Sequence, residues 1–282
     1  MHPVFLDLGP LLGTGLHLRI GAYGTFLLAA LALGGWIGAR AGRRLAPQVP
    51  WPELIGAMLA TGVLVAKLFA VLEHAPGLAA GAFTWRAALT AGGHWLPGAI
   101  AGFGVGCLWL RRCGVPLGLG FNALVLAVSP AHALARVGCL LAGCCHGRPT
   151  ELPWGIVYGD PLAHELQGTP LGVPLHPSPI YEALCEAFNF ALCLRLARRG
   201  AAPWQVVATW AALYGSERFL LETLRGGDAS YLGPLTTNQA LGLALVLAGG
   251  SHLALSWSRG RRRLFGKLLP ATAGRHAQGD IA

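Results

Sequence analysis

The chain has 282 residues, of which 54% are hydrophobic and only 12% are charged, and its mean hydropathy is +0.54. A soluble domain usually carries about 25% charged residues, so this composition excludes a soluble protein and predicts an all-α membrane protein. The net charge of +9 would suit nucleic acid, but the distribution of basic residues argues against that partner. Most of the 21 lysines and arginines follow apolar segments in four clusters: Arg40/Arg43/Arg44, Arg111/Arg112, Arg195/Arg198/Arg199 and Arg259/Arg261/Arg262/Arg263/Lys267.

Seven apolar segments, each long enough for the roughly 20 residues that a bilayer crossing needs, predict about seven transmembrane helices. Their approximate ranges are 21–39, 54–73, 95–110, 119–144, 179–197, 203–223 and 238–257. The basic clusters follow the first, third, fifth and seventh segments, and cytoplasmic loops are the ones enriched in lysine and arginine. The N-terminus is therefore expected outside and the C-terminus inside.

The seven helices are expected to form one membrane domain over residues 1–260, followed by a basic, disordered cytoplasmic tail over 261–282. Prolines recur through the outer loop 145–178, and because they interrupt regular structure, we expect a small periplasmic or extracellular cap there. We find no internal repeat, which argues against the inverted-repeat architecture of many transporters.

Ionisable residues recur at helical spacing in three of the apolar segments, so each set lies along one helix face. Charges inside hydrocarbon cost several kcal/mol unless they face a protein interior or a wet cavity. Three such faces are best satisfied by one another, which predicts a polar chamber inside the bundle. The sets are His132/Arg136/Cys139/Gly143, Glu182/Glu186/Asn189 and Tyr214/Arg218/Glu222/Arg225.

Two arginines, Arg136 and Arg148, flank a short segment at the outer end of the fourth predicted helix. A guanidinium group binds a phosphate in bidentate fashion, and Gly143 and Gly147 leave the backbone open to a ligand. The alternative is that Arg136 pairs with a carboxylate such as Glu182 and only holds the bundle together.

The loop that enters the fifth helix reads His176-Pro-Ser-Pro-Ile-Tyr-Glu182. Ser178 is expected to cap the helix, whose N-terminus would direct partial positive charge toward the outer chamber. Tyr181 and Glu182 then lie one turn in, and Glu182 either serves the reaction or forms a buried ion pair.

In the sixth helix Arg218 and Glu222 could pair at i,i+4, which leaves Tyr214 and Arg225 unexplained; a second phosphate-facing arginine is the alternative.

Four of the seven cysteines are scattered in apolar helices as small buried residues. Cys139, Cys144 and Cys145 cluster at the outer face, where packing, a disulfide and metal binding remain alternatives; packing is favoured, and we assign no metal and no cofactor.

Taken together, these segments resemble the prolipoprotein diacylglyceryl transferase family, as a divergent Gly-Cys-Cys-x-Gly variant. The resemblance covers residue 2 to about residue 250 and rests on the order of the motifs. They are His2-Pro3, Arg19, Tyr23-Gly24, Val63–Leu72, Gly92-Gly93, Arg136-Val-Gly, Gly143, Gly147-Arg148, Pro153-Trp154-Gly155, His176-Pro-Ser, Tyr181-Glu182 and Tyr214-Gly with Arg218, Glu222 and Arg225.

This resemblance implies a multi-pass enzyme of the bacterial cytoplasmic (inner) membrane. It would transfer diacylglyceryl from phosphatidylglycerol to the lipobox cysteine thiol of a preprolipoprotein, forming a thioether and releasing glycerol 1-phosphate. Arg136 and Arg218 would stabilise the phosphate, and His146 or His94 would serve as the base. Substrate contacts are expected from Tyr23, Cys139, Gly143, Gly147, Arg148, His176, Tyr181, Glu182, Tyr214, Glu222 and Arg225.

The chain departs from the family pattern at the positions that would hold the base. Pro97 stands where the family has a histidine, Cys139 replaces an asparagine, and Cys144 replaces an acidic residue. Two alternatives therefore stay open: a paralogue with the same lipid site and another acceptor, or a non-enzymatic lipid-binding or thiol-redox membrane protein.

Overall fold

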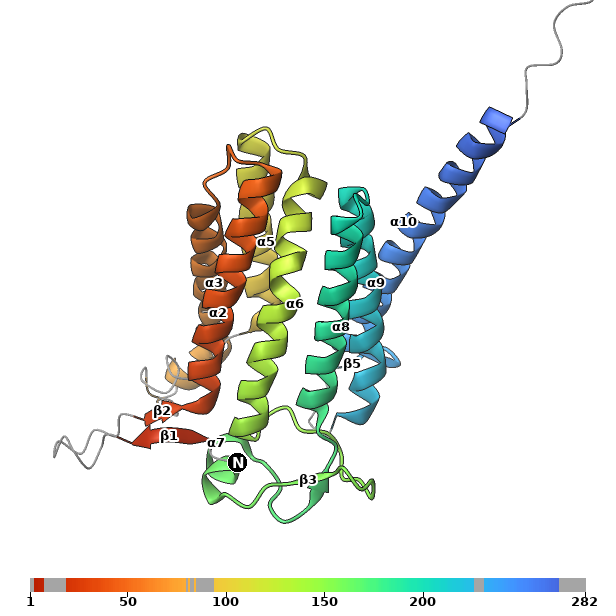
Figure 1. Cartoon of the computed structure of the whole chain (residues 1–282). Helices are drawn as coiled ribbons and strands as arrows, with labels where there is room; N and C mark the ends of the chain where they lie inside the picture. The colour runs from red at the N-terminus through yellow and green to blue at the C-terminus, as the bar shows by residue number, and fades with distance from the viewer. Residues whose placement is uncertain are drawn as a thin grey trace, which may run out of the picture.

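The computed structural model describes residues 3–7, 19–79, 81, 84, 94–225 and 231–268, with side chains to residue 258 in the last range. His2, Gly92, Gly93 and most of the predicted tail lie outside the described residues. Within them, seven helices are 18 residues or longer (Figure 1). These are α2 (Ala22–Leu45), α3 (Trp51–Ala79), α5 (Trp95–Arg112), α6 (Leu117–Ala142), α8 (Ser178–Arg198), α9 (Pro203–Leu221) and α10 (Thr237–Leu268).

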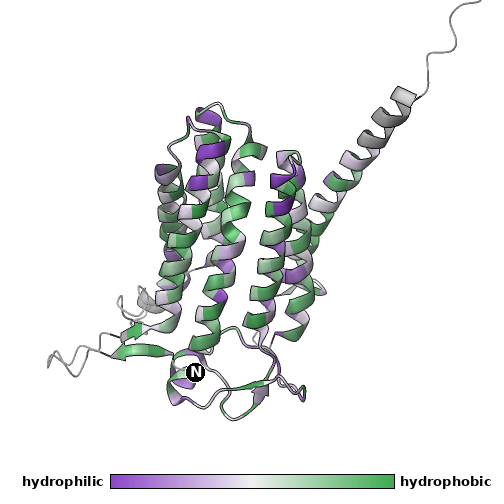
Figure 2. Cartoon of the chain, in the orientation of Figure 1, coloured by the Kyte–Doolittle hydropathy of each residue, from purple (hydrophilic) through white to green (hydrophobic). Residues whose placement is uncertain are grey.

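Four of these helices are long and apolar enough to cross a membrane: α2, α3 over Trp51–Gly77, α6, and α10 over Thr237–Ser258. Hydrophobic residues run along the bundle, as Figure 2 shows. The chain is therefore an all-α, multi-pass membrane protein. Helices α8 and α9 carry buried charges at Glu182, Glu186, Glu217 and Arg218, so their composition alone does not mark them as membrane spans. The sequence predicts seven crossings, which is more than these four candidate spans.

Two helix ends differ from those predicted from hydropathy. Helix α2 continues to Leu45 rather than ending near residue 39, and Arg43 and Arg44 occupy its last turn. Basic side chains interact favourably with a helix C-terminus, so the charged cluster extends the helix instead of ending it. Helix α10 likewise runs to Leu268, past the predicted end near 257, and leaves the bundle as it does so (Figure 1).

Helix α6 is central, since it packs against α2, α8 and α9, while α3 packs against α5 and α9 against α10. An apolar core joins the ends of α2, α3, α5 and α6 that lie away from the cap. There Trp51 is fully buried and donates from Nε1 to the Ala46 carbonyl at 2.9 Å. Gly42 makes room for this ring, because a Cβ at that position would lie 2.1 Å from it.

The predicted cap is an ordered structure between α6 and α8 (Figure 1). It contains helix α7 (Pro161–Gln167) and an antiparallel pair of strands, β3 (Ile156–Val157) and β4 (Pro174–Leu175). Tyr158 is buried and donates to the Leu140 carbonyl at 3.0 Å, which fastens the cap to α6. The remaining short elements are β1 (Val4–Asp7) paired with β2 (Arg19–Gly21), η1 (Glu222–Leu224), and β5 (Tyr231–Leu232) paired with β6 (Leu235–Thr236).

Candidate active site

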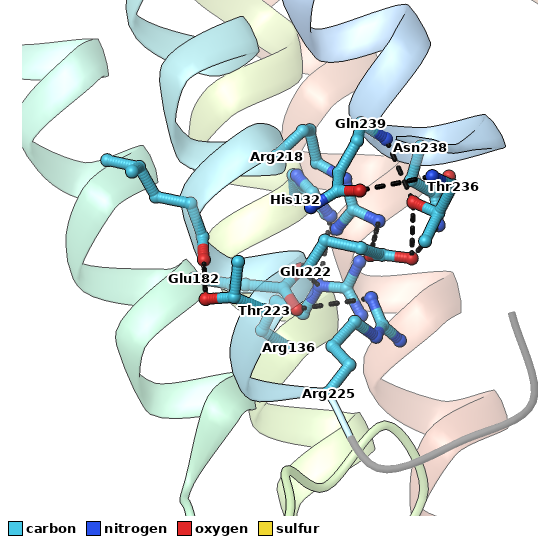
Figure 3. Close-up of polar contacts among 11 residues, drawn as sticks. His132, Arg136, Glu182, Arg218, Glu222, Thr223, Arg225, Thr236, Asn238 and Gln239 are labelled. Carbon is cyan, nitrogen blue, oxygen red and sulfur yellow. Dashed lines mark hydrogen bonds and ion pairs between the residues drawn. The ribbon is translucent and has the colours of Figure 1, made fainter. Parts of the chain in front are cut away.

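The buried carboxylate of Glu182, in the second turn of α8, is the centre of a network of three arginines (Figure 3). Arg136 Nε of α6 lies 2.8 Å from Glu182 Oε2, and Arg218 Nη1 of α9 lies 3.1 Å from the same oxygen. Arg225 Nη1, just after η1, lies 3.4 Å from Oε1. Two segments far apart in sequence, α6 and the stretch from α9 to the residue after η1, therefore bring three guanidinium groups to one carboxylate of α8.

A second ring of polar contacts holds these arginines in place. Arg136 Nε also donates to His132 Nε2 at 3.0 Å, and His132 Nδ1 lies 2.6 Å from the buried Glu186. Arg218 Nη2 is 3.6 Å from Glu222, whose Oε1 accepts from Asn238 Nδ2 at 3.0 Å. Arg136 and Arg218 are thus each restrained from two sides, which pre-organises the site.

Both structural alternatives raised by the sequence are present, because Arg136 pairs with Glu182 and Arg218 pairs with Glu222 at i,i+4. In direct contact, three guanidinium groups face the two carboxylates of Glu182 and Glu222, so the guanidinium groups outnumber the carboxylates that they touch, while Glu186 pairs with His132. Such an arrangement can attract and hold an anion.

An apolar cavity of about 530 Å³ lies beside this network, between α2, α3, α5, α6 and α9. His132 and Tyr214 are among its lining residues, so the cavity reaches the arginine network through the His132–Arg136 hydrogen bond. Tyr214 stacks on Trp210 with ring centroids 5.1 Å apart. A molecule with an anionic group and a long apolar part would match the cavity and the arginines together.

The cap joins the arginine network at Gly147, which forms an isolated bridge with Arg225. A Cβ at Gly147 would lie 2.5 Å from His176 Cβ and 2.7 Å from the Leu224 carbonyl, so only glycine fits this crossing. Arg148 Nε donates to the Arg225 carbonyl at 3.1 Å. These two residues therefore position the segment that carries Arg225.

The loop that leads into α8 makes its own polar contacts. Tyr181 accepts from Trp154 Nε1 at 2.8 Å and lies 3.4 Å from His176 Nδ1. Ser178 does not cap the helix as its sequence position predicts, since Pro177 is the N-cap residue. The buried Ser178 hydroxyl has no hydrogen-bond partner among the described residues.

Three cysteine thiols gather where α6 ends, and their sulfur atoms all lie within 4.8 Å of one another. Cys139 is buried, whereas Cys144 and Cys145 are partly exposed, and all three are free thiols. Arg136 Nη1 lies 3.8 Å from Cys139 Sγ, so the cluster adjoins the arginine network. The neighbouring thiols of Cys139 and Cys144, helped by the charges of Arg136 and Arg225, lower the pKa of the Cys145 thiol.

The other predicted site residues take more distant or structural positions. His94 is exposed and pairs with Glu73 of α3 at 2.7 Å, and no contact joins it to the described arginine network. His146 Nδ1 donates to the Gly147 carbonyl at 3.0 Å. Gly143 ends α6 in a left-handed conformation at φ 85° and binds Thr169 through its carbonyl at 2.9 Å. Tyr23, 42% exposed, lies on α2 against Gly138 of α6.

Three residues belong to the site although the sequence analysis assigned them no catalytic or binding role: the partly buried His132 and the buried Glu186 and Glu217. His132 and Glu186 link α6 to α8, and their helical spacing to Arg136 and Glu182 is what placed them on the faces of the predicted polar chamber. Glu217 of α9 is 6% exposed, and its Oε1 has no hydrogen-bond partner in the described part of the chain. A buried carboxylate oxygen without a partner, on a residue next to Arg218, makes Glu217 a candidate for a functional role.

A family model described as prolipoprotein diacylglyceryl transferase matches residues 11–255. A phosphatidylglycerol–prolipoprotein diacylglyceryl transferase of Azotobacter vinelandii is 31% identical over 276 residues, which cover 92% of this chain and 96% of the relative. Similarity to two clostridial relatives is more local. The chain spans 49% of the transferase of Clostridium tetani at 31% identity, and 63% of transferase 2 of Clostridium perfringens at 34% identity.

Proposed function

Because the chain belongs to the prolipoprotein diacylglyceryl transferase family, we propose that it is a transferase that uses phosphatidylglycerol as lipid donor and a preprolipoprotein as acceptor. Relatives are named for these two substrates. The diacylglyceryl group would pass to the lipobox cysteine thiol, a thioether would form, and glycerol 1-phosphate would leave.

The observation that carries this proposal is the convergence of Arg136, Arg218 and Arg225 on Glu182. When the glyceryl C–O bond breaks, negative charge builds on the phosphate oxygen that leaves. Fixed guanidinium groups in a place of low dielectric stabilise such charge without having to reorganise. Glu182 keeps the three cations together while the site is empty, and the phosphate would share them when the lipid is bound.

The apolar cavity supports a lipid as the donor. Its volume of about 530 Å³ is that of a small-molecule site, and its lining residues Leu27, Leu31, Met58 and Leu59 suit an acyl chain. The cavity meets the arginine network at His132 and Tyr214. A lipid lying there would have its acyl part among α2, α3 and α6 and its phosphate at Arg136.

We propose further that all seven long helices cross the bacterial cytoplasmic membrane, with the N-terminus and the cap outside. Helix α8 exposes Leu184 and Phe188, at 64% and 62%, and α5 exposes Ile100 at 65%, so both present apolar side chains outward. The last turns of α2, α5 and α8 are basic and lie at the end of the bundle away from the cap. Basic residues favour the cytoplasmic side.

Rescue of bacteria depleted of their own transferase tests this function. The chain is expected to restore growth, whereas Arg136→Ala and Arg218→Ala are expected to abolish rescue at unchanged expression. Removal of one such charge-stabilising group typically costs about 10²–10³ in rate. Arg198→Ala is the matched control, because Arg198 is an exposed residue in the last turn of α8. Full rescue by both site variants would overturn the assignment of the arginines.

A further inference from the structure

The three-cysteine cluster is formed by an unusual chain reversal at the end of α6. Gly143 has φ 85° and Cys145 has φ 58°, the only positive φ among the described non-glycine residues. A left-handed conformation costs a residue with a side chain energy of order 1 kcal/mol, and such residues concentrate at functional sites. Here the reversal turns Cys144 and Cys145 back toward Cys139, so the backbone strain and the convergence of the thiols have one cause.

The spacing of the sulfur atoms fits a single metal ion. In a tetrahedral thiolate site with metal–sulfur bonds of about 2.3 Å, sulfur atoms lie roughly 3.8 Å apart. The three Sγ atoms lie within 4.8 Å of one another and are not bonded to each other. Simple packing of three small side chains would not require the left-handed backbone of Cys145.

We propose that Cys139, Cys144 and Cys145 bind one Zn²⁺ ion, and that its fourth coordination position takes the acceptor thiol as a thiolate. This inference rests on the proposed function and adds the means by which the thiol becomes nucleophilic. Zinc sites with three protein ligands and one open position are the catalytic type. A thiol that coordinates such an ion is deprotonated outright.

The position of the cluster supports this role. Arg136 Nη1 lies 3.8 Å from Cys139 Sγ, so a thiolate held at the ion would stand next to the arginines that are proposed to hold the lipid phosphate. Cys144 and Cys145 are partly exposed, which leaves the ion reachable by a peptide. Four thiolates around Zn²⁺ carry excess negative charge, and the neighbouring guanidinium group offsets it.

Two histidines that could act as a base are already engaged with other groups. Both nitrogens of His132 are engaged, Nε2 by Arg136 and Nδ1 by Glu186. His94 pairs with Glu73 instead. A metal-bound thiolate needs no such base, which is consistent with Pro97 in α5 at the position where a histidine was expected.

The acceptor thiol gives its proton to water as its sulfur binds Zn²⁺. A sulfur electron pair then attacks the glyceryl carbon of the lipid, and a C–S bond forms. The C–O bond to phosphate breaks, and its electron pair stays on the phosphate oxygen of the leaving glycerol phosphate. The thioether sulfur is a weaker ligand than a thiolate, so the product can leave the metal.

Metal analysis of the purified full-length chain tests the site without any lipid or acceptor. We expect about one Zn²⁺ per chain, and a fall to less than roughly a tenth of that in the Cys144→Ser/Cys145→Ser variant, because three-coordinate protein sites need every ligand. Cys107→Ser, which removes a thiol from α5, is the matched control and should keep its zinc. Thermal unfolding of all three proteins shows whether the double variant remains folded.

A second measurement tests the open position. In the Co²⁺-loaded chain, a lipobox peptide with cysteine should increase the thiolate-to-cobalt absorption, whereas the same peptide with serine should leave it unchanged. A wild-type chain without stoichiometric zinc, or a cobalt absorption spectrum that does not change when the cysteine peptide is added, would overturn this inference. Transfer from phosphatidylglycerol by a zinc-free chain would overturn the zinc inference and leave the proposed function standing. A zinc-loaded chain that binds the peptide but transfers nothing would overturn the proposed function instead.

Discussion

Glu182 shows what a single buried carboxylate can do among several cations. It has no exposed surface, and guanidinium groups of Arg136, Arg218 and Arg225 reach its two oxygens. Burial of any one of these charges alone would cost several kcal/mol, and the mutual contacts offset that cost. The carboxylate therefore makes it possible to keep three arginines close together before a substrate arrives.

Glu182→Gln should destabilise the protein strongly, because it leaves three partly buried guanidinium groups with less counter-charge. The expected loss is about 3–5 kcal/mol in the free energy of unfolding, as for other broken buried pairs. Unfolding in mixed micelles of a denaturing detergent measures it. Glu151→Gln, in the exposed cap, is the control and should change stability little. A similar small change in both variants would show that the network does not stabilise the fold.

For single residues, the sequence predicts which side chains share a helix face, but it does not predict how the helices are turned toward one another. The i,i+4 pair of Arg218 with Glu222 and the pairing of Arg136 with Glu182 could be anticipated. The contact of Arg225 with Glu182 could not, because it depends on how η1 turns after α9. The Glu73 partner of His94 was equally hidden, since it depends on how α3 and α5 face each other.

The helices themselves were the most predictable elements, because long apolar runs leave the backbone no alternative in lipid but to bond internally. Each of the seven long helices lies where hydropathy placed it, and their ends differ where basic residues extend a helix, as in α2. Composition alone does not mark α8 and α9 as membrane spans, because charges that are satisfied only inside the bundle lower their hydropathy.

Close helix packing depends on particular glycines. Two adjacent glycines in α10 distinguish the effect of helix–helix packing on stability from the effect of helix propensity. A Cβ at Gly249 would lie 2.4 Å from the Ala208 carbonyl of α9, whereas a Cβ at Gly250 would meet nothing within 4 Å. Gly249→Ala should therefore force α9 and α10 apart and cost about 1–3 kcal/mol in the free energy of unfolding. Gly250→Ala should be neutral or slightly stabilising. Equal effects in the same unfolding assay would contradict the close approach of these helices.

At the scale of the whole molecule, the bundle encloses a polar network and an apolar cavity, and the cap covers one of its ends. The sequence predicted the polar chamber from its three charged helix faces, and the cap from its prolines. The cavity could not be predicted, because its walls come from α2, α3, α5, α6 and α9 and depend on their spacing. The link from the cap to Arg225 through Gly147 also requires the folded chain.

The orientation of the molecule is open to a direct chemical test. A cysteine introduced by Glu151→Cys in the cap should react with a membrane-impermeant maleimide in intact cells whose outer membrane has been permeabilised. Arg198→Cys, at the opposite end of α8, should react only after the inner membrane is broken. The unaltered chain gives the background from its native thiols. The reverse pattern of labelling would place the cap in the cytoplasm and contradict the proposed orientation.

The arginines that converge on Glu182 are proposed to hold the phosphate of the lipid while the glyceryl carbon is transferred. Transfer in vitro tests this, with the purified chain in phosphatidylglycerol vesicles and a lipobox peptide, followed by mass spectrometry of the thioether product. The intact chain and Arg198→Ala should form product, and Arg136→Ala and Arg218→Ala should each lose about 100-fold or more in rate. Product formation by both site variants at the rate of the intact chain would show that these arginines do not hold the phosphate during transfer.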